Sequence, residues 1–108
     1  MFTSLLVIED SHLRYVRGQE KLKTYSTAKS PESGNVMTNH FCIECGTLMS
    51  RTSAIYPGHN LLRLGTVDDF NLAEGKLKPT AEIYVKDRCS WVKGLEDEGV
   101  QKYDGALS

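Results

Sequence analysis

The sequence predicts a mainly β protein of antiparallel sheets with little helix. Short runs of residues alternate between apolar and polar side chains, as the strands of a half-buried sheet do. Pro, Gly and small polar residues separate these runs and mark turns. No segment carries the roughly ten residues of clean helical periodicity that would predict a long helix.

The predicted elements of the first half follow one another closely. The apolar run at residues 5–8 and the alternating run at 13–17 predict two strands joined by a polar turn. Residues 22–26 alternate again and predict a third strand. Residues 28–35 combine Pro and Gly with small polar side chains, which predicts an exposed hairpin loop.

In the second half, residues 36–41 lead into a cysteine turn as a strand and residues 46–50 lead out of it. Residues 61–64 predict a buried strand, and 66–70 predict a turn or short helical corner, since Asp68 and Asp69 are turn and N-cap residues. Residues 81–85 predict the last strand. Beyond Trp91 we expect a short helical turn and a frayed tail.

Length and composition limit the organisation of the chain. At 108 residues it can form one modest core, and its 40% hydrophobic residues are too many for a wholly disordered protein. We expect a domain over residues 1–95 and a C-terminal tail over 96–108.

Charge and targeting signals exclude several classes of partner. The net charge is -1 and no dense Lys/Arg cluster occurs, so neither nucleic acid nor an anionic membrane is indicated. The N-terminal apolar run has no basic region before it, which argues against a signal peptide, and no apolar stretch is long enough to span a bilayer. Three cysteines, an odd number, are typical of a reducing compartment. We therefore expect an intracellular, cytoplasmic protein.

The strongest chemical motif is Cys42-x-x-Cys45-Gly46. A two-residue spacer lets the backbone curl so that both sulfurs face one point, and Gly46 supplies a permissive conformation after the second cysteine. Zinc is the metal that this spacing favours. A thioredoxin-like redox pair is the alternative, but it needs a helix N-terminus under the first cysteine, and the flanks read as strands. Two ordinary thiols are the remaining interpretation.

The predicted metal ligands, Cys42 and Cys45, form only half of a tetrahedral site. The other ligands must come from outside this sequence or from the remaining candidates, which are His12, His40, His59 and Cys89. His40 lies two residues before Cys42, but a strand neighbour rarely reaches a metal held at the turn. Cys89 has no second ligand-type residue at metal spacing, and each of the four has an ordinary structural interpretation as well.

No catalytic residue is predicted. Asp68 and Asp69 are interpreted as capping residues because the side chains of adjacent residues diverge. Cys89 has no base placed beside it. Arg63, between two leucines, is expected to reach solvent or an acidic neighbour.

The order of the motifs carries a family resemblance. Phe41 precedes the cysteine turn, and the corner Gly-Thr-Val-Asp-Asp at 65–69 and the strand that leads to Trp91 follow it. In this order the chain resembles, over nearly its whole length, the family of glutathione-dependent formaldehyde-activating enzymes and centromere-protein-V-like proteins. That resemblance implies an Mss4-like β fold in which Cys42 and Cys45 are two ligands of a structural zinc.

The resemblance also implies an activity. Its members are zinc-dependent carbon–sulfur lyases that act on glutathione adducts, so it implies glutathione as co-substrate and a small-molecule thiol adduct as partner. In the family, N-terminal cysteine groups complete the structural zinc site and hold a catalytic zinc, and this sequence shows neither group. We therefore expect an N-terminally truncated chain that is inactive alone. A non-catalytic zinc-binding or interaction domain, or an inactive fragment, is the alternative, with self-association through the exposed strand at residues 5–8.

Overall fold

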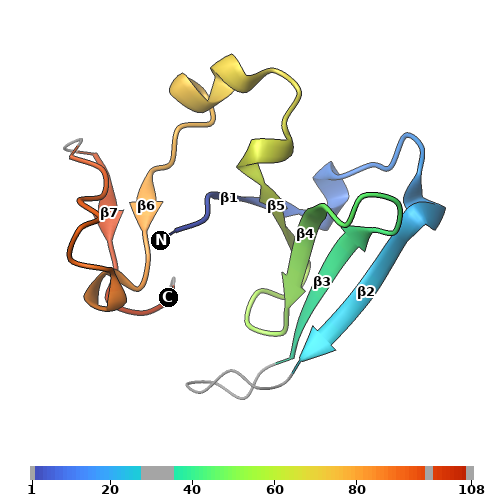
Figure 1. Ribbon diagram of the computed structural model, residues 1–108, viewed down its shortest axis with the longest axis horizontal. Coiled ribbons are helices and arrows are strands. Elements are labelled where there is room, and N and C mark those ends of the chain that lie inside the picture. Colours follow the sequence, from blue (N-terminus) through green and yellow to red (C-terminus); the bar gives the residue numbers. More distant parts are fainter. Residues whose placement is uncertain (1, 28–35, 97–98, 107–108) are drawn as a thin grey trace. The chain divides into compact units, whose positions relative to one another are not determined.

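The computed structural model describes residues 2–27, 36–96 and 99–106 (Figure 1). In these residues it consists of β-strands and short 3₁₀ helices. The predicted mainly β, antiparallel fold class is thereby confirmed. The chain divides into two compact units, the sheet unit (Leu5–Asp68) and the C-terminal unit (Met1–Ser4 with Asp69–Ser108). The predicted hairpin loop at 28–35 lies outside the described residues.

The sheet unit is built on one five-stranded sheet in the order β1-β5-β4-β3-β2. All neighbouring strands in it run antiparallel. Its strands are β1 (Leu5–Glu9), β2 (Leu22–Thr27), β3 (Met37–Cys42), β4 (Leu48–Ser53) and β5 (His59–Arg63). The 3₁₀ helices of this unit are η1 (Asp10–His12), η2 (Gln19–Lys21) and η3 (Leu64–Thr66).

Apolar pairing holds β1 to β5. Leu6 lies opposite Leu62 and Val7 opposite Leu61, so apolar side chains face each other on both sides of this strand pair. Among the described residues the buried apolar side chains are those of Leu61 and Leu64. The core is therefore small.

The strand predicted at residues 13–17 is wrong. These residues pair with no strand, and they link η1 to η2. The reason is topological: β1 lies at one edge of the sheet and β2 at the other, so the connection must cross the sheet and cannot join its ladder.

The C-terminal unit contains two short strands, β6 (Ala81–Glu82) and β7 (Gln101–Lys102), which pair in parallel. Two 3₁₀ helices, η4 (Phe70–Glu74) and η5 (Val85–Asp87), belong to it. Asp69 caps η4 by accepting a hydrogen bond from the Asn71 N–H at 3.1 Å, which confirms its predicted capping role.

Two sequence predictions fail in the C-terminal unit. The last strand ends at Glu82 instead of residue 85, because Tyr84 adopts a left-handed backbone with φ 54° that a strand cannot continue through. The predicted frayed tail instead supplies β7. Its backbone is held to residues 80–85, for example by the Tyr103 N–H, which donates to the Glu82 carbonyl at 2.9 Å.

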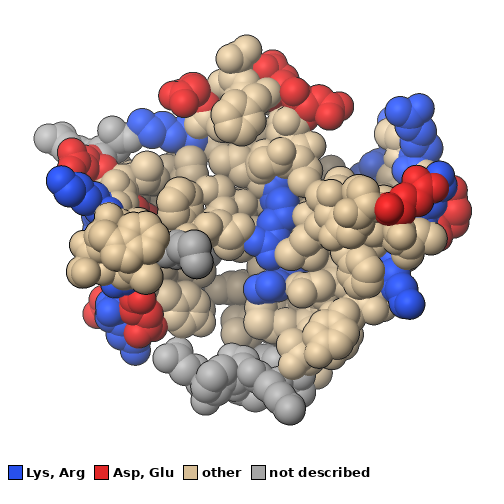
Figure 2. Space-filling view, in the orientation of Figure 1, with Lys and Arg blue, Asp and Glu red and all other residues tan. Residues whose placement is uncertain are grey.

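In the described part of the chain, no helix has the length and apolar character that a membrane crossing requires. On the face that Figure 2 shows, acidic and basic side chains lie close together at the end of the sheet where β2 begins. The turn between β3 and β4 lies at this same end (Figure 1).

Candidate metal centre

The cysteine turn joins β3 to β4 as a tight, hydrogen-bonded reversal. Cys42 is the last residue of β3, and its carbonyl accepts a hydrogen bond from the Gly46 N–H at 2.8 Å. Its own N–H donates to the Thr47 carbonyl at 2.9 Å. Gly46 has φ 77°, a backbone that favours glycine, so the glycine after the second cysteine allows the chain to turn here.

Polar groups surround the two sulfurs. The Glu44 N–H donates to Cys42 Sγ at 3.4 Å, and Cys45 Sγ lies 3.1 Å from Thr47 Oγ1. Hydrogen bonds from Thr47, first through its side chain and then through its backbone, lower the pKa of the Cys45 thiol, and the Cys42 thiol lowers it further. The two sulfurs are therefore close enough to interact, and the turn favours the thiolate form that a metal binds.

The turn is anchored to the start of β2. The Ile43 N–H donates to the Lys21 carbonyl at 2.9 Å, and Lys21 Nζ lies 2.7 Å from Glu44 Oε1. No local sequence pattern indicates this contact, because Lys21 and Glu44 are 23 residues apart. Residues 43–47 are nevertheless all exposed, so the tip of the hairpin is open to solvent.

The histidines named as further ligands lie in other contacts. His40 Nε2 is 3.4 Å from Thr52 Oγ1, and His59 Nδ1 is 3.0 Å from the Pro57 carbonyl. His12 Nδ1 lies 3.9 Å from Glu9 Oε2.

Cys89, the other candidate ligand, belongs to the C-terminal unit and is exposed. Across residues 2–27, 36–96 and 99–106, no group of three or more His, Cys, Asp or Glu side chains is placed to hold a metal. The structure thus brings Cys42 and Cys45 together and adds no third ligand from these residues.

The redox alternative for the cysteine pair needs a helix that begins at the first cysteine. Here Cys42 ends a strand, and the chain reverses directly into β4. Nothing in this backbone supplies the helix dipole that activates thioredoxin-like cysteines. The local fold favours a metal knuckle.

Arg63 is the last residue of β5. Its guanidinium is half-buried, and its pKa is lowered first by desolvation and then by the neighbouring charge of Arg51. Arg51 itself donates from Nε to Asn39 Oδ1 at 2.8 Å across the β3–β4 pair. The like charge of Arg51 thus acts on Arg63, and the expected contact with solvent or an acidic neighbour stays a prediction.

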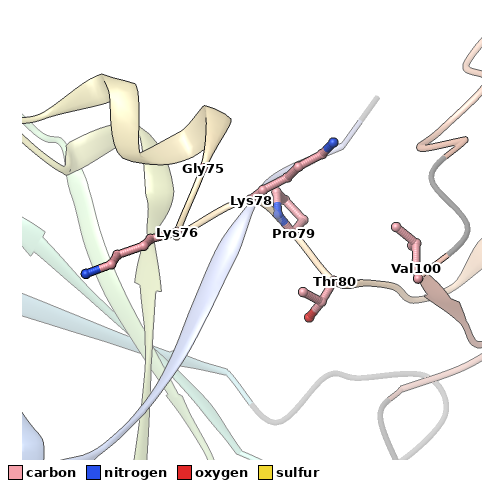
Figure 3. Close-up of a pocket in the computed structure, with 7 residues that line it drawn as sticks. Gly75, Lys76, Lys78, Pro79, Thr80 and Val100 are labelled. Carbon is pink, nitrogen blue, oxygen red and sulfur yellow. The ribbon is translucent and has the colours of Figure 1, made fainter.

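A shallow pocket of about 250 Å³ lies within the C-terminal unit (Figure 3). The lysine side chains at its rim, Lys76 and Lys78, point away from the space between Thr80 and Val100. Its lining residues are Gly75, Lys76, Lys78, Pro79, Thr80, Gly99 and Val100, which include no thiol, imidazole or carboxylate. It therefore offers none of the side chains that usually bind zinc.

Comparison with known families decides where the chain belongs. The sequence profile of the family described as glutathione-dependent formaldehyde-activating enzyme matches residues 1–87. The chain belongs to this family. No curated protein and no solved structure matches it. The resemblance to the glutathione-dependent formaldehyde-activating family is confirmed, whereas the likeness to centromere-protein-V-like proteins and to the Mss4-like fold stays a prediction, as does the domain end at residue 95.

The glutathione-dependent formaldehyde-activating family is associated with zinc, and the knuckle fits zinc as two of its four ligands. The fit rests on the adjacent sulfurs of Cys42 and Cys45 and on the N–H group that points at the first of them. The matched region includes the whole sheet unit and therefore the whole knuckle.

Proposed function

We propose that this member of the glutathione-dependent formaldehyde-activating family binds a structural zinc through Cys42 and Cys45. The observation that carries the proposal is the hydrogen-bonded turn that holds both sulfurs at the exposed end of the β3–β4 hairpin. Zinc bound there would cross-link the turn and add to the stability of a fold with a small core.

The activity that the family suggests is the cleavage of carbon–sulfur bonds in glutathione adducts, with zinc as cofactor and glutathione as co-substrate. A catalytic zinc needs an open coordination position in addition to its protein ligands. In the part of the chain that the structure describes, the only paired thiols are those of the knuckle. We therefore propose that the 108-residue chain alone binds zinc without turning over such an adduct. A reducing, intracellular location suits its free thiols.

Cobalt titration tests the zinc site. Co²⁺ added to the reduced, metal-free chain is expected to give the intense near-ultraviolet absorption of thiolate-to-metal charge transfer. Cys42→Ser and Cys45→Ser should each lose most of this absorption, because each removes one of the paired thiolates. Cys89→Ser is the matched control and should keep it. Equal absorption from Cys42→Ser and from the unaltered chain would contradict the proposal.

The same preparation, loaded with zinc, tests the lack of turnover. It is incubated with glutathione and formaldehyde, and the rate at which their adduct forms is followed. We expect a rate no higher than that of buffer. Turnover that a chelator abolishes would show that this chain builds a catalytic site, and would exclude the non-catalytic alternative.

A further inference from the structure

We propose that Arg51 of β4 and Arg63 of β5 bind the carboxylate of a small organic acid between them, on one face of the five-stranded sheet. We call these two residues the arginine pair. Neither Cys42 nor Cys45 belongs to this site, which therefore does not depend on the zinc binding proposed above.

The strand register places both arginines on the same face of the sheet. Arg51 lies directly opposite Leu61, and Arg63 follows Leu61 by two residues along β5. Since side chains alternate along a strand, all three point to one side. Diagonal neighbours of this kind lie about 7 to 8 Å apart, so two long arginine side chains can reach one group between them. Figure 2 shows basic side chains with uncharged ones around them at the place where Figure 1 draws β4 and β5.

The guanidinium of Arg51 is held in place by the neighbouring strand. Asn39 of β3 lies directly opposite Arg51, and its Oδ1 accepts a hydrogen bond from Arg51 Nε at 2.8 Å. This bond occupies Nε and orients the planar group, whose two terminal nitrogens can pair end-on with both oxygens of a carboxylate. Arg51 and Arg63 are both half-buried, so a ligand meets donors with restricted freedom.

The electrostatic surroundings of the arginine pair favour an anion. Desolvation, and after it the charge of Arg51, lower the pKa of Arg63. The two cations therefore repel each other, and a carboxylate between them is attracted by both. Leu5 lies opposite Arg63 and Leu61 lies beside it on the same face, and apolar neighbours strengthen this attraction relative to water. An acid group on a short carbon chain matches this combination of charge and apolar surface.

Nuclear magnetic resonance of the ¹⁵N-labelled chain tests the site directly. The chain is kept reduced with dithiothreitol, which carries no carboxylate, and is titrated with three probes. These are succinate, glutathione, which has two free carboxylates, and glutathione diethyl ester, in which both are blocked. We expect succinate and glutathione to shift the signals of Arg51, Arg63 and Asn39 to saturation, and the diethyl ester to leave them unchanged. Added sodium chloride should weaken the binding.

Substitutions test whether the two guanidiniums form the site. Arg51→Gln and Arg63→Gln should each weaken succinate binding by about tenfold. Arg51→Lys keeps the charge without the planar fork, and its affinity should fall between those of Arg51→Gln and the unaltered chain. Arg17→Gln is the matched control, because it removes the same charge from an exposed position between η1 and η2 and should keep the affinity. Circular dichroism shows whether each variant still folds.

The outcomes decide between this site and its absence. Signals of the arginine pair that respond to neither acid would overturn the proposal. Equal binding of the diethyl ester, or an equal loss in Arg17→Gln, would also overturn it, because the contact would not be one of a carboxylate with these two guanidiniums. A response to glutathione alone would support the site and identify the source of the carboxylate.

Cys42→Ser separates this site from the proposed function, since it should bind succinate as the unaltered chain does. Succinate binding by a chain that takes up no cobalt would overturn the proposed function alone. Cobalt uptake without succinate binding would overturn the carboxylate site alone.

Discussion

Glu82 is the residue where the polar contacts of the C-terminal unit meet. Its carboxylate accepts hydrogen bonds from Arg88 Nη1 at 3.0 Å, from Lys102 Nζ at 3.3 Å and from the Leu95 N–H. The backbone hydrogen bond from Leu95 is the largest cause of the lowered pKa of Glu82. The charges of Lys102 and Arg88 lower this pKa further, whereas desolvation of the carboxylate raises it. One side chain thereby ties β6 to β7 and to the loop between η5 and β7.

Replacement of this carboxylate gives a prediction with a defined pH dependence. Because folding lowers the pKa of Glu82, its contribution to stability is present above the carboxyl's ordinary pKa and is lost as pH falls through the lower folded value. Glu82→Gln should therefore destabilise the protein by about 1 to 2 kcal/mol at pH 7. The difference should shrink below about pH 4. Urea unfolding at several pH values measures it. Glu74→Gln, at an exposed position, is the control, and an equal loss from it would show a nonspecific charge effect.

At the scale of elements, the turns at Gly46 and Gly94 depend on the left-handed backbone of these glycines. Gly46 allows the reversal after Cys45 that joins β3 to β4. Gly94 has φ 75°, and a Cβ there would collide with Arg88 Nη1 and with the Glu82 carboxylate. The loop before β7 thus closes directly over the ion pair.

Gly94→Ala is expected to destabilise the protein by about 2 to 3 kcal/mol, because it adds a steric collision to an unfavourable φ. Gly18→Ala is the matched control, since Gly18 has a similar φ of 79° with nothing within 4 Å of an added Cβ. It should lose about 1 kcal/mol, the cost of the backbone alone. Denaturant unfolding of both variants measures the difference. Equal losses would show that the backbone at Gly94 does not lie against the ion pair.

At the scale of the whole molecule, the main sheet buries little apolar surface. Leu61 and Leu64 are the buried apolar residues among those described, and β1 and β2 are the two edges of the sheet. A small core gives a small free energy of unfolding, so a metal bound at the knuckle can contribute a large share of the total. The stability of the protein should then depend on zinc.

Thermal melts with and without zinc test this contribution. Zinc should raise the midpoint of the unaltered chain by about 4 to 8 °C for each kcal/mol of coupled binding, and Cys42→Ser should not respond. An equal response from Cys42→Ser would show that the knuckle does not bind the metal.

What the sequence determined by itself is the local part of this protein. An apolar run predicted β1, alternation predicted β2, and the segment that leads into the cysteine turn predicted β3. These predictions succeed because each pattern depends on neighbouring residues only. The spacing of Cys42 and Cys45 predicted the turn between two strands, since a Cys-x-x-Cys-Gly segment carries its own backbone requirements. The family resemblance also followed from motifs in sequence order, and the family match confirms it.

The tertiary structure alone decided which segments become neighbours. Because β1 pairs with β5, it lies at the opposite edge of the sheet from β2. Residues 13–17 therefore form part of the connection between the two edges, although they alternate as a strand would. Hydrogen bonds to residues 80–85 turned the predicted tail into β7. The contact of Lys21 with Glu44 has the same origin. The physical reason is that hydrogen bonds and apolar burial stabilise contacts between segments that are distant in the sequence. A pattern of neighbouring residues does not indicate which distant segment will form these contacts.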